Sequence, residues 1–235
     1  MTASTPPVAL VHGWGGSFAT TWQRNGFTAL LEDAGVPVIG IDLLGHGSAP
    51  KPHEAEEYSD LSTRIVEALP DEPVDAIGFS LGAITLLRLA IERPERFNRL
   101  VLAGIGSNIF DRDESATTAI VAGLETVAEG GDSAGLDNTV RLFTQYASQP
   151  GNDLQALTAV MKRPAGAPLT PEGCAQVTCP VLVVVGDKDF VYPADELAAS
   201  FPNGRCETLR GVDHFATTDA FEFFDAALEF LDAVC

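Results

Sequence analysis

Short apolar runs recur along the chain, and each one ends at a segment of glycine or polar residues. The runs occupy residues 8–11, 36–41, 74–79, 100–103, 181–185 and 205–209. Most of them hold apolar residues at consecutive positions rather than alternating ones, which is typical of strands buried on both faces. The pattern predicts six strands.

Helical patterns fill most intervals between these strands, at residues 22–32, 61–69, 81–93, 196–201 and 220–234. Strands that alternate with helices predict an α/β fold, with a mostly parallel sheet covered by helices on both faces. In such sheets, ligands bind at the carboxyl ends of the strands. The loops at His12, Asp42, Ser80 and Asp187 follow strand ends, so we expect them to open onto one shared face.

Residues 104–178 interrupt this alternation. They contain three helical patterns, separated by glycine and proline, and no convincing strand; the patterns are at residues 115–128, 136–147 and 153–162. A stretch rich in proline and glycine closes the interval. We therefore expect a core of residues 1–103 and 179–235 and a helical insertion, residues 104–178, over the strand ends.

The charge of the chain excludes several functions. There are 14 Lys and Arg residues against 33 Asp and Glu, a net charge of −19. Nucleic-acid binding needs clustered Lys and Arg, and the same deficit argues against anionic membrane surfaces. No apolar run approaches the roughly 20 residues that span a bilayer, and residues 1–7 lack a signal-peptide pattern. The four cysteines form no C-x-x-C pair, so we expect a cytoplasmic protein without a metal or other cofactor.

One serine stands in a setting that favours catalysis. Residues 78–82, Gly-Phe-Ser-Leu-Gly, match G-x-S-x-G between a predicted strand and a predicted helix. This is the context of a nucleophile elbow, a tight turn that presents the serine hydroxyl at a helix N-terminus. Backbone N–H groups there favour developing negative charge. The pattern predicts Ser80 as the nucleophile; the alternative is a serine that only caps the helix.

A serine nucleophile requires a base, usually histidine. His214 follows the last predicted strand and precedes the last predicted helix, so it can reach the carboxyl face of the sheet. His12 precedes a glycine-rich turn, His46 lies in a Gly-His-Gly loop, and His53 falls in a polar segment that suits a solvated role. We predict His214 as the base; the alternative is a histidine held by loop carbonyls.

The base in turn needs an acid that holds its tautomer. Asp187 and Asp189 both follow the strongest late strand. Asp189 is the stronger candidate, because Asp187 lies at the strand end beside Lys188, where capping a turn or pairing with that lysine suffices. Asp213 adjoins His214 in sequence, which makes an approach to that ring awkward, and we expect it to be a turn residue.

The chain order Ser80, Asp189, His214 is that of the α/β-hydrolase fold, and the sequence resembles that superfamily over nearly its whole length. The matching segments are HGWGG at 12–16, DLLGHGS at 42–48, the elbow, GDKDFVYP at 186–193 and the His214 loop. It looks most like small serine esterases of the type grouped with the non-haem perhydrolases. The resemblance implies that Asp189 is the acid, that residues 104–178 form a lid, and that the backbone N–H groups of Trp14 and Leu81 form the oxyanion hole.

The sequence departs from this family at its start. Family members usually have an antiparallel hairpin before the strand that ends at His-Gly, and only seven residues precede that strand here. We therefore expect about six strands instead of the usual eight, with the catalytic loops undisturbed.

Serine at the elbow indicates acyl transfer, whereas the haloalkane dehalogenase and epoxide hydrolase branches of the family place aspartate there. Ester hydrolysis is the first expectation, and the net charge weakly favours a small, neutral ester. Several apolar side chains are candidates to line the pocket, although each could equally be ordinary core. They are Phe79, Phe110, Phe143, Tyr146, Met161, Phe190 and Phe215, with Trp14 on the floor.

Two alternatives remain at this point. A C–C bond hydrolase acting on a vinylogous diketo acid uses the same three side chains and would need an arginine in the pocket, for which Arg112, Arg141 and Arg163 are candidates. A small-molecule receptor on the same fold is a different class of function, and an apparently complete triad argues against it. The sequence leaves open whether the protein forms homo-oligomers.

Overall fold

The computed structural model describes residues 5–111, 114–132 and 135–233. Within them, six strands form one parallel sheet in the order β2-β1-β3-β4-β5-β6. The sheet confirms the six predicted strands. The strands are β1 (Val8–Val11), β2 (Val38–Ile41), β3 (Val74–Phe79), β4 (Phe97–Ala103), β5 (Val181–Gly186) and β6 (Gly204–Leu209).

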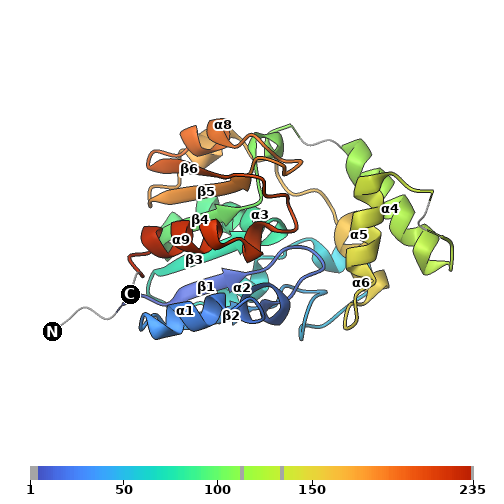
Figure 1. Cartoon of the computed structure of the whole chain (residues 1–235), viewed down its shortest axis with the longest axis horizontal. Helices are drawn as coiled ribbons and strands as arrows, with labels where there is room; N and C mark the ends of the chain where they lie inside the picture. The colour runs from blue at the N-terminus through green and yellow to red at the C-terminus, as the bar shows by residue number, and fades with distance from the viewer. Residues whose placement is uncertain (1–4, 112–113, 133–134, 234–235) are drawn as a thin grey trace.

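Helices cover both faces of the sheet (Figure 1). On one face lie α1 (Phe27–Asp33) and α9 (Phe221–Phe230); on the other lie α2 (Thr63–Ala68), α3 (Leu81–Glu92) and α8 (Asp195–Ala199). The short elements are η2 (Ala55–Tyr58), η3 (Pro94–Arg96), η4 (Ser107–Ile109) and α7 (Pro171–Cys174). Among the described residues, no helix has the length and apolar character needed to cross a membrane.

The apolar side chains of the central strand β3 explain why helices cover both faces of the sheet. Every residue of β3 is buried, and alternate side chains enter different hydrophobic clusters. Val74 and Ala76 pack under α3, whereas Ile77 and Phe79 pack under α1 and α9. This period of two places apolar side chains on both faces of the sheet. The edge strand β6 is largely exposed, in keeping with its weaker apolar pattern.

One predicted helix is wrong as a continuous element. Residues 22–32 are divided into a π-helix, η1 (Ala19–Gln23), and α1. The chain between them turns at Gly26, whose φ of 85° is a conformation that favours glycine. Asn25 fixes the turn, since its Nδ2 donates to the Thr21 carbonyl and its Oδ1 accepts from the Phe27 N–H. The other predicted helices are present, with small shifts at their ends.

The insertion after β4 contains α4 (Glu114–Ala128), α5 (Asn138–Ala147) and α6 (Leu154–Lys162). The described part of residues 104–178 holds no strand, as predicted. The Asp137 and Asp153 carboxylates accept hydrogen bonds from N–H groups in the first turns of α5 and α6, which explains where these helices begin. In Figure 1 the three helices stand together to one side of the sheet, away from both chain termini.

Candidate active site

The turn between β3 and α3 holds Ser80 in a strained conformation, with φ 50° and ψ −112°. The flanking glycines allow it. A Cβ on Gly78 would lie 2.7 Å from the backbone of Ala83, and one on Gly82 would lie 2.5 Å from the His12 carbonyl oxygen. A larger residue at either position would therefore collide with backbone. The turn places the Ser80 hydroxyl at the N-terminus of α3, where backbone N–H groups favour negative charge.

Three predicted residues meet at this turn. The Ser80 Oγ lies 3.0 Å from His214 Nε2, and His214 Nδ1 lies 2.8 Å and 3.0 Å from the two Asp189 carboxylate oxygens. Asp189 Oδ1 also accepts from the Val191 N–H. An ionised carboxylate can only accept, so Nδ1 carries a proton and Nε2 is free to take the Ser80 proton. His214 and Asp189 are both 5% exposed, which keeps the pair from bulk water.

The competing carboxylates have other partners. Asp187 Oδ1 accepts from the Gly211 N–H at 2.7 Å, which joins the loops after β5 and β6. Asp213 Oδ1 accepts from the Ala216 N–H at 3.0 Å within its own turn. Asp213 has the turn role that the sequence indicated, whereas Asp187 links two loops instead of capping its own turn or pairing with Lys188. Asp189 is the carboxylate that reaches His214.

The loop after β1 packs directly against the serine turn. A Cβ on Gly13 would lie 2.8 Å from the Phe79 ring and 3.3 Å from the Ser80 Cβ. Two hydrogen bonds of the His12 ring stabilise this loop: Nδ1–H donates to the Gly13 carbonyl, and Nε2 accepts from the Leu43 N–H. Burial lowers the pKa of His12, so the neutral tautomer that these bonds require persists at neutral pH.

The backbone N–H groups of Trp14 and Leu81 have no hydrogen-bond acceptor among the described residues. Trp14 follows Gly13 in the loop that packs on Ser80, and Leu81 is the first residue of α3. Two unpaired donors beside a serine hydroxyl are what an oxyanion hole requires.

The remaining histidines lie apart from the serine. His46 is fully buried and its Nδ1–H donates to the Leu44 carbonyl; burial, reinforced by neighbouring His12, lowers its pKa to about 3. His53 is exposed, as predicted, and contacts Asp153 at 3.0 Å. Within the described residues, no group of three or more His, Cys, Asp or Glu side chains could hold a metal ion.

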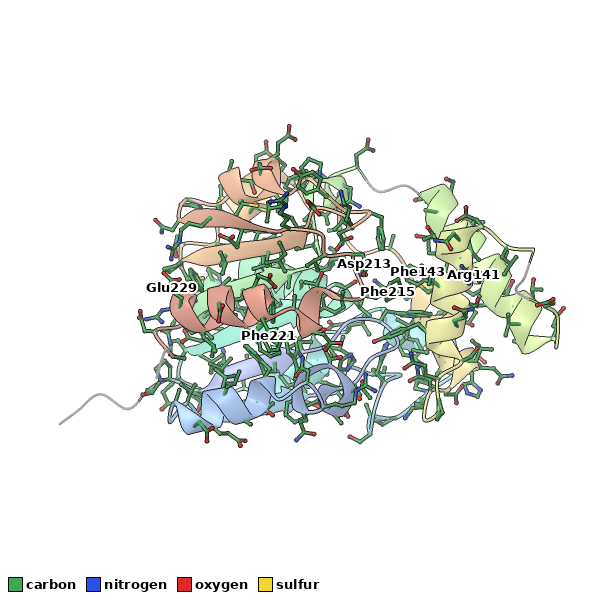
Figure 2. All side chains as sticks on the ribbon, in the orientation of Figure 1. Arg141, Phe143, Asp213, Phe215, Phe221 and Glu229 are labelled. Carbon is green, nitrogen blue, oxygen red and sulfur yellow. The ribbon has the colours of Figure 1, made fainter. Side chains whose placement is uncertain are left out.

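The helical insertion is attached to the loop after β1 by two hydrogen bonds. The Trp14 indole N–H donates to the Leu157 carbonyl of α6 at 3.1 Å, and Asn152 Nδ2 donates to the Gly15 carbonyl at 2.9 Å. Aromatic contacts continue the junction. Figure 2 shows Phe143 of the insertion beside Phe215 of the core, and their ring centres are 5.8 Å apart. The insertion therefore contacts the site on the side of the sheet where the strands end.

A pocket of about 70 Å³ contains Ser80 and His214. Of the predicted lining residues, Trp14, Phe79, Phe143, Tyr146 and Phe215 form its apolar wall. Phe190 stacks on His214 at 4.4 Å but is 53% exposed and lies outside the lining. Phe110 and Met161 also lie outside it and pack against the hydrophobic core.

The pocket has a polar side that the sequence did not reveal, formed by Thr20, Thr21, Arg24, Thr218 and Asp219. Thr20 and Thr21 belong to η1, Arg24 directly follows it, and Thr218 and Asp219 belong to η5 (Thr217–Asp219). Asn25 joins the two segments by donating to the carbonyls of Thr21 and Thr218. In the sequence, only their position could have indicated these residues: residues 20–24 follow the loop at 12–16, and residues 218–219 follow the His214 loop. Threonine and a single arginine in such places have no catalytic signature of their own.

Comparison with known proteins identifies the family of the chain. Residues 8–227 match the alpha/beta hydrolase family, and the chain belongs to it. It is 27% identical to a pimeloyl-[acyl-carrier protein] methyl ester esterase of Aeromonas hydrophila, over 89% of this chain and 88% of that protein. It is 26% identical to a 2-hydroxy-6-oxononadienedioate/2-hydroxy-6-oxononatrienedioate hydrolase of Cupriavidus pinatubonensis, over 95% and 85%. The structure of BpoC from Mycobacterium tuberculosis H37Rv aligns with a TM-score of 0.75 at 22% identity, over 98% and 93%.

Proposed function

We propose that this alpha/beta hydrolase is a serine esterase that cleaves small carboxylic esters through an acyl-enzyme intermediate. The hydrogen-bonded series Ser80, His214, Asp189 carries the proposal. His214 takes the hydroxyl proton as Ser80 Oγ attacks the ester carbonyl carbon, then gives that proton to the departing alcohol. Water then attacks the acyl carbon while His214 takes a proton from it. His214 returns this proton to Ser80 Oγ as the bond from Oγ to the acyl carbon breaks, which releases the carboxylic acid and restores the Ser80 hydroxyl.

Trp14 and Leu81 stabilise the negative charge that develops on the carbonyl oxygen. Their unpaired N–H groups support this role, as does the position of Leu81 at the start of a 12-residue helix. Such donors act on a transition state more strongly than in water, because the site is largely closed to solvent. Asp189 orients His214 and stabilises its protonated form without itself taking the proton.

Residues 104–178 act as a lid that shapes the substrate pocket. The hydrogen bonds from Trp14 to Leu157 and from Asn152 to Gly15 support this role. Phe143 and Tyr146 of the lid lie opposite Phe215 of the core, so the acyl group enters an apolar space. The small volume of the pocket favours a short acyl chain, and the net charge of −19 favours a neutral substrate.

A C–C bond hydrolase is the second candidate, because one relative carries that activity in its name. Its acidic substrate would need a cation in the pocket. Arg112 lies outside the described residues, Arg141 donates to Asn138, and Arg163 donates to the Val160 carbonyl. Neither Arg141 nor Arg163 lines the pocket, whereas exposed Arg24 does. Asp219 lines the same pocket with a charge opposite to that of Arg24, so the lining has no net positive charge for an acidic substrate, and the ester remains the favoured substrate.

A series of p-nitrophenyl esters with acyl chains of about two to twelve carbons tests the proposal, since pocket size limits chain length. We expect the wild-type protein to turn over these esters rapidly, with a preference for short acyl chains. We expect no turnover by the Ser80→Ala variant. Cleavage of a vinylogous diketo acid without ester turnover would favour the C–C hydrolase. A single slow labelling event without product release would indicate a receptor.

A further inference from the structure

Three phenylalanine rings contact the imidazole of His214. The centres of the Phe190, Phe79 and Phe215 rings lie 4.4 Å, 5.0 Å and 5.6 Å from the imidazole centre. The Phe190 and Phe79 rings are each inclined to the imidazole by 37°, whereas Phe215 meets it at 87°. Phe190 is therefore the nearest ring, and its small inclination at this separation indicates stacking rather than an edge-to-face contact.

Phe190 differs from the other two rings in its surroundings. Phe79 is buried in the core, and Phe215 lines the pocket. Phe190 is 53% exposed and belongs to neither the core clusters nor the pocket lining; its other ring contact is with Phe143 of the insertion, at 6.2 Å. Replacing Phe190 would remove little core packing, so the effect should be felt mainly at His214.

The backbone turn after β5 places this ring on His214. The N–H of Val191 donates to Asp189 Oδ1 at 3.0 Å, and the N–H of Tyr192 donates to the Asp189 carbonyl at 3.1 Å. Phe190 lies within this turn. The same few residues therefore bring the Asp189 carboxylate to His214 Nδ1 and the Phe190 ring to a face of the imidazole.

An aromatic ring acts more strongly on a charged imidazole than on a neutral one. His214 becomes an imidazolium when it takes the Ser80 proton. The face of a phenyl ring carries partial negative charge and attracts a cation within about 6 Å of its centre. The Phe190 ring lies inside this limit, at 4.4 Å. Its attraction is therefore stronger in the transition state than in the ground state, which is the condition for accelerating a reaction.

We propose that Phe190 is a positioning residue for the proposed ester hydrolysis: its ring holds the imidazole against Asp189 and stabilises the imidazolium that forms as Ser80 attacks. This inference rests on the proposed esterase function and gives Phe190 a role other than lining the pocket. A leucine side chain would also cover His214 but has no negatively charged face. Phe190→Leu therefore separates electrostatic stabilisation from simple covering.

Kinetics of Phe190→Leu with p-nitrophenyl acetate test the inference. Acylation and deacylation both pass through the imidazolium, so kcat should fall by about 2- to 5-fold with KM unchanged, the range of a partly exposed cation–π contact. The acidic limb of the profile of kcat/KM against pH should move to lower pH by about 0.3–0.7 pH units, because the imidazolium loses a stabilising contact. Phe190→Tyr keeps the ring and should behave as the wild-type protein.

Phe221→Leu is the matched control, because Phe221 is 79% exposed, lies outside the pocket lining and contacts Phe224. It should leave the rate and the pH profile unchanged. The variants all retain the titratable side chains that bond to His214 or line the pocket with it, namely Asp189, Arg24, Asp219 and Tyr146. Movement of the acidic limb to higher pH in Phe190→Leu would show that the ring only shields His214 from water. That result, or an unchanged rate and profile, would overturn the inference.

Nuclear magnetic resonance of isotope-labelled histidine provides a readout without turnover. The midpoint of the His214 titration should lie at lower pH in Phe190→Leu than in the wild-type protein. Exposed His53, which contacts Asp153, serves as the internal control and should titrate identically in both. If the wild-type protein cleaves no ester, the proposed function fails, and an unchanged His214 midpoint would then reject the role of Phe190 separately.

Discussion

Two buried carboxylates lie at opposite ends of the same sheet, Asp189 after the carboxyl end of β5 and Asp75 near the amino end of β3. They are 5% and 3% exposed, so water reaches neither freely. Asp189 bonds to His214 and to the Val191 N–H. Asp75 Oδ1 has no hydrogen-bond partner among the described residues. The two carboxylates are therefore buried to a similar extent, but both carboxylate oxygens of Asp189 are hydrogen-bonded, whereas Asp75 Oδ1 has no partner in the described part of the chain.

The difference shows what each end of the sheet contributes. At the amino end, burial raises the pKa of Asp75 to about 6, with Arg99 opposing the shift and Asp232 adding to it. The ionised Asp75 carboxylate, buried without a hydrogen-bond partner for Oδ1, lowers the stability of the fold, and no candidate site residue among those described lies beside it. At the carboxyl end, the strained Ser80 backbone costs on the order of 1–3 kcal/mol, yet it presents the hydroxyl to His214. We expect substitutions at the carboxyl end to change activity and substitutions at the amino end to change stability.

The largest effect should come from Ser80→Ala. Removing the hydroxyl removes the nucleophile, and kcat for ester hydrolysis should fall by about 10³-fold or more. Thermal unfolding should change little, since the hydroxyl contributes little packing. Ser59→Ala, at an exposed serine away from the site, is the matched control and should retain full activity. An active Ser80→Ala variant would contradict the claim that the carboxyl end of the sheet carries the activity.

Asp189→Asn should have the next largest effect. An amide cannot hold His214 in the required tautomer, and kcat should fall by up to about 10⁴-fold, as in the serine-protease case. Asp187→Asn is the matched control, because Asp187 bonds to the Gly211 N–H and does not reach His214. Steady-state kinetics of both variants decide the assignment; a greater loss in Asp187→Asn would transfer the role to Asp187.

Phe143→Ala and Met161→Ala should distinguish pocket-lining residues from core residues within the helical insertion. Phe143 lines the pocket, so its truncation should shift preference toward longer acyl chains, by about 4-fold per added methylene. Met161 packs against the core, so its truncation should lower stability by roughly 2–5 kcal/mol and leave the chain-length profile unchanged. Melting curves and the ester series on both variants check this. An unchanged profile in Phe143→Ala would contradict its place in the pocket.

Asp75→Asn should have the smallest effect, confined to stability. The folded-state pKa of about 6 exceeds the ordinary value of 3.8, so the wild-type protein should lose stability as the pH rises from about 4 to about 6. The loss then persists at higher pH, at roughly 1.4 kcal/mol per unit of pKa difference. Removing the charge should raise the Tm at pH 8 by roughly 6–12 °C and leave it nearly unchanged at pH 4.

Activity at pH 8 and moderate temperature should be the same in Asp75→Asn and wild type. An equal rise in Tm at both pH values would show that ionisation of Asp75 is not the cause.

The strands and the serine turn could be predicted because they depend on local pattern. Consecutive apolar residues predicted β3, and glycines on both sides of Ser80 predicted the tight turn. His214 and Asp189 could be predicted from their places after late strands, since parallel strands bring those loops to one face. The structure contains the predicted strand and turn, and it brings Ser80, His214 and Asp189 within hydrogen-bonding distance.

Other features could not be predicted, because they depend on how distant segments pack. Phe110 and Phe143 are equivalent as apolar residues of the insertion, yet only Phe143 lines the pocket. Thr21 and Thr218 are far apart in the chain, and Asn25 links their turns. The break at Gly26 that shapes η1 has no clear signal within a helical pattern. The sequence pattern thus indicated the candidate catalytic residues but not the residues that line the pocket around them.

The central claim is that Ser80 forms the covalent intermediate. Incubation with a p-nitrophenyl phosphonate, followed by proteolysis and mass spectrometry, tests it directly. The account predicts one phosphonyl group per chain, attached to Ser80, with activity lost in step with labelling and no labelling in Asp189→Asn on the same time scale. Labelling of another serine, or full activity after Ser80 is modified, would contradict it.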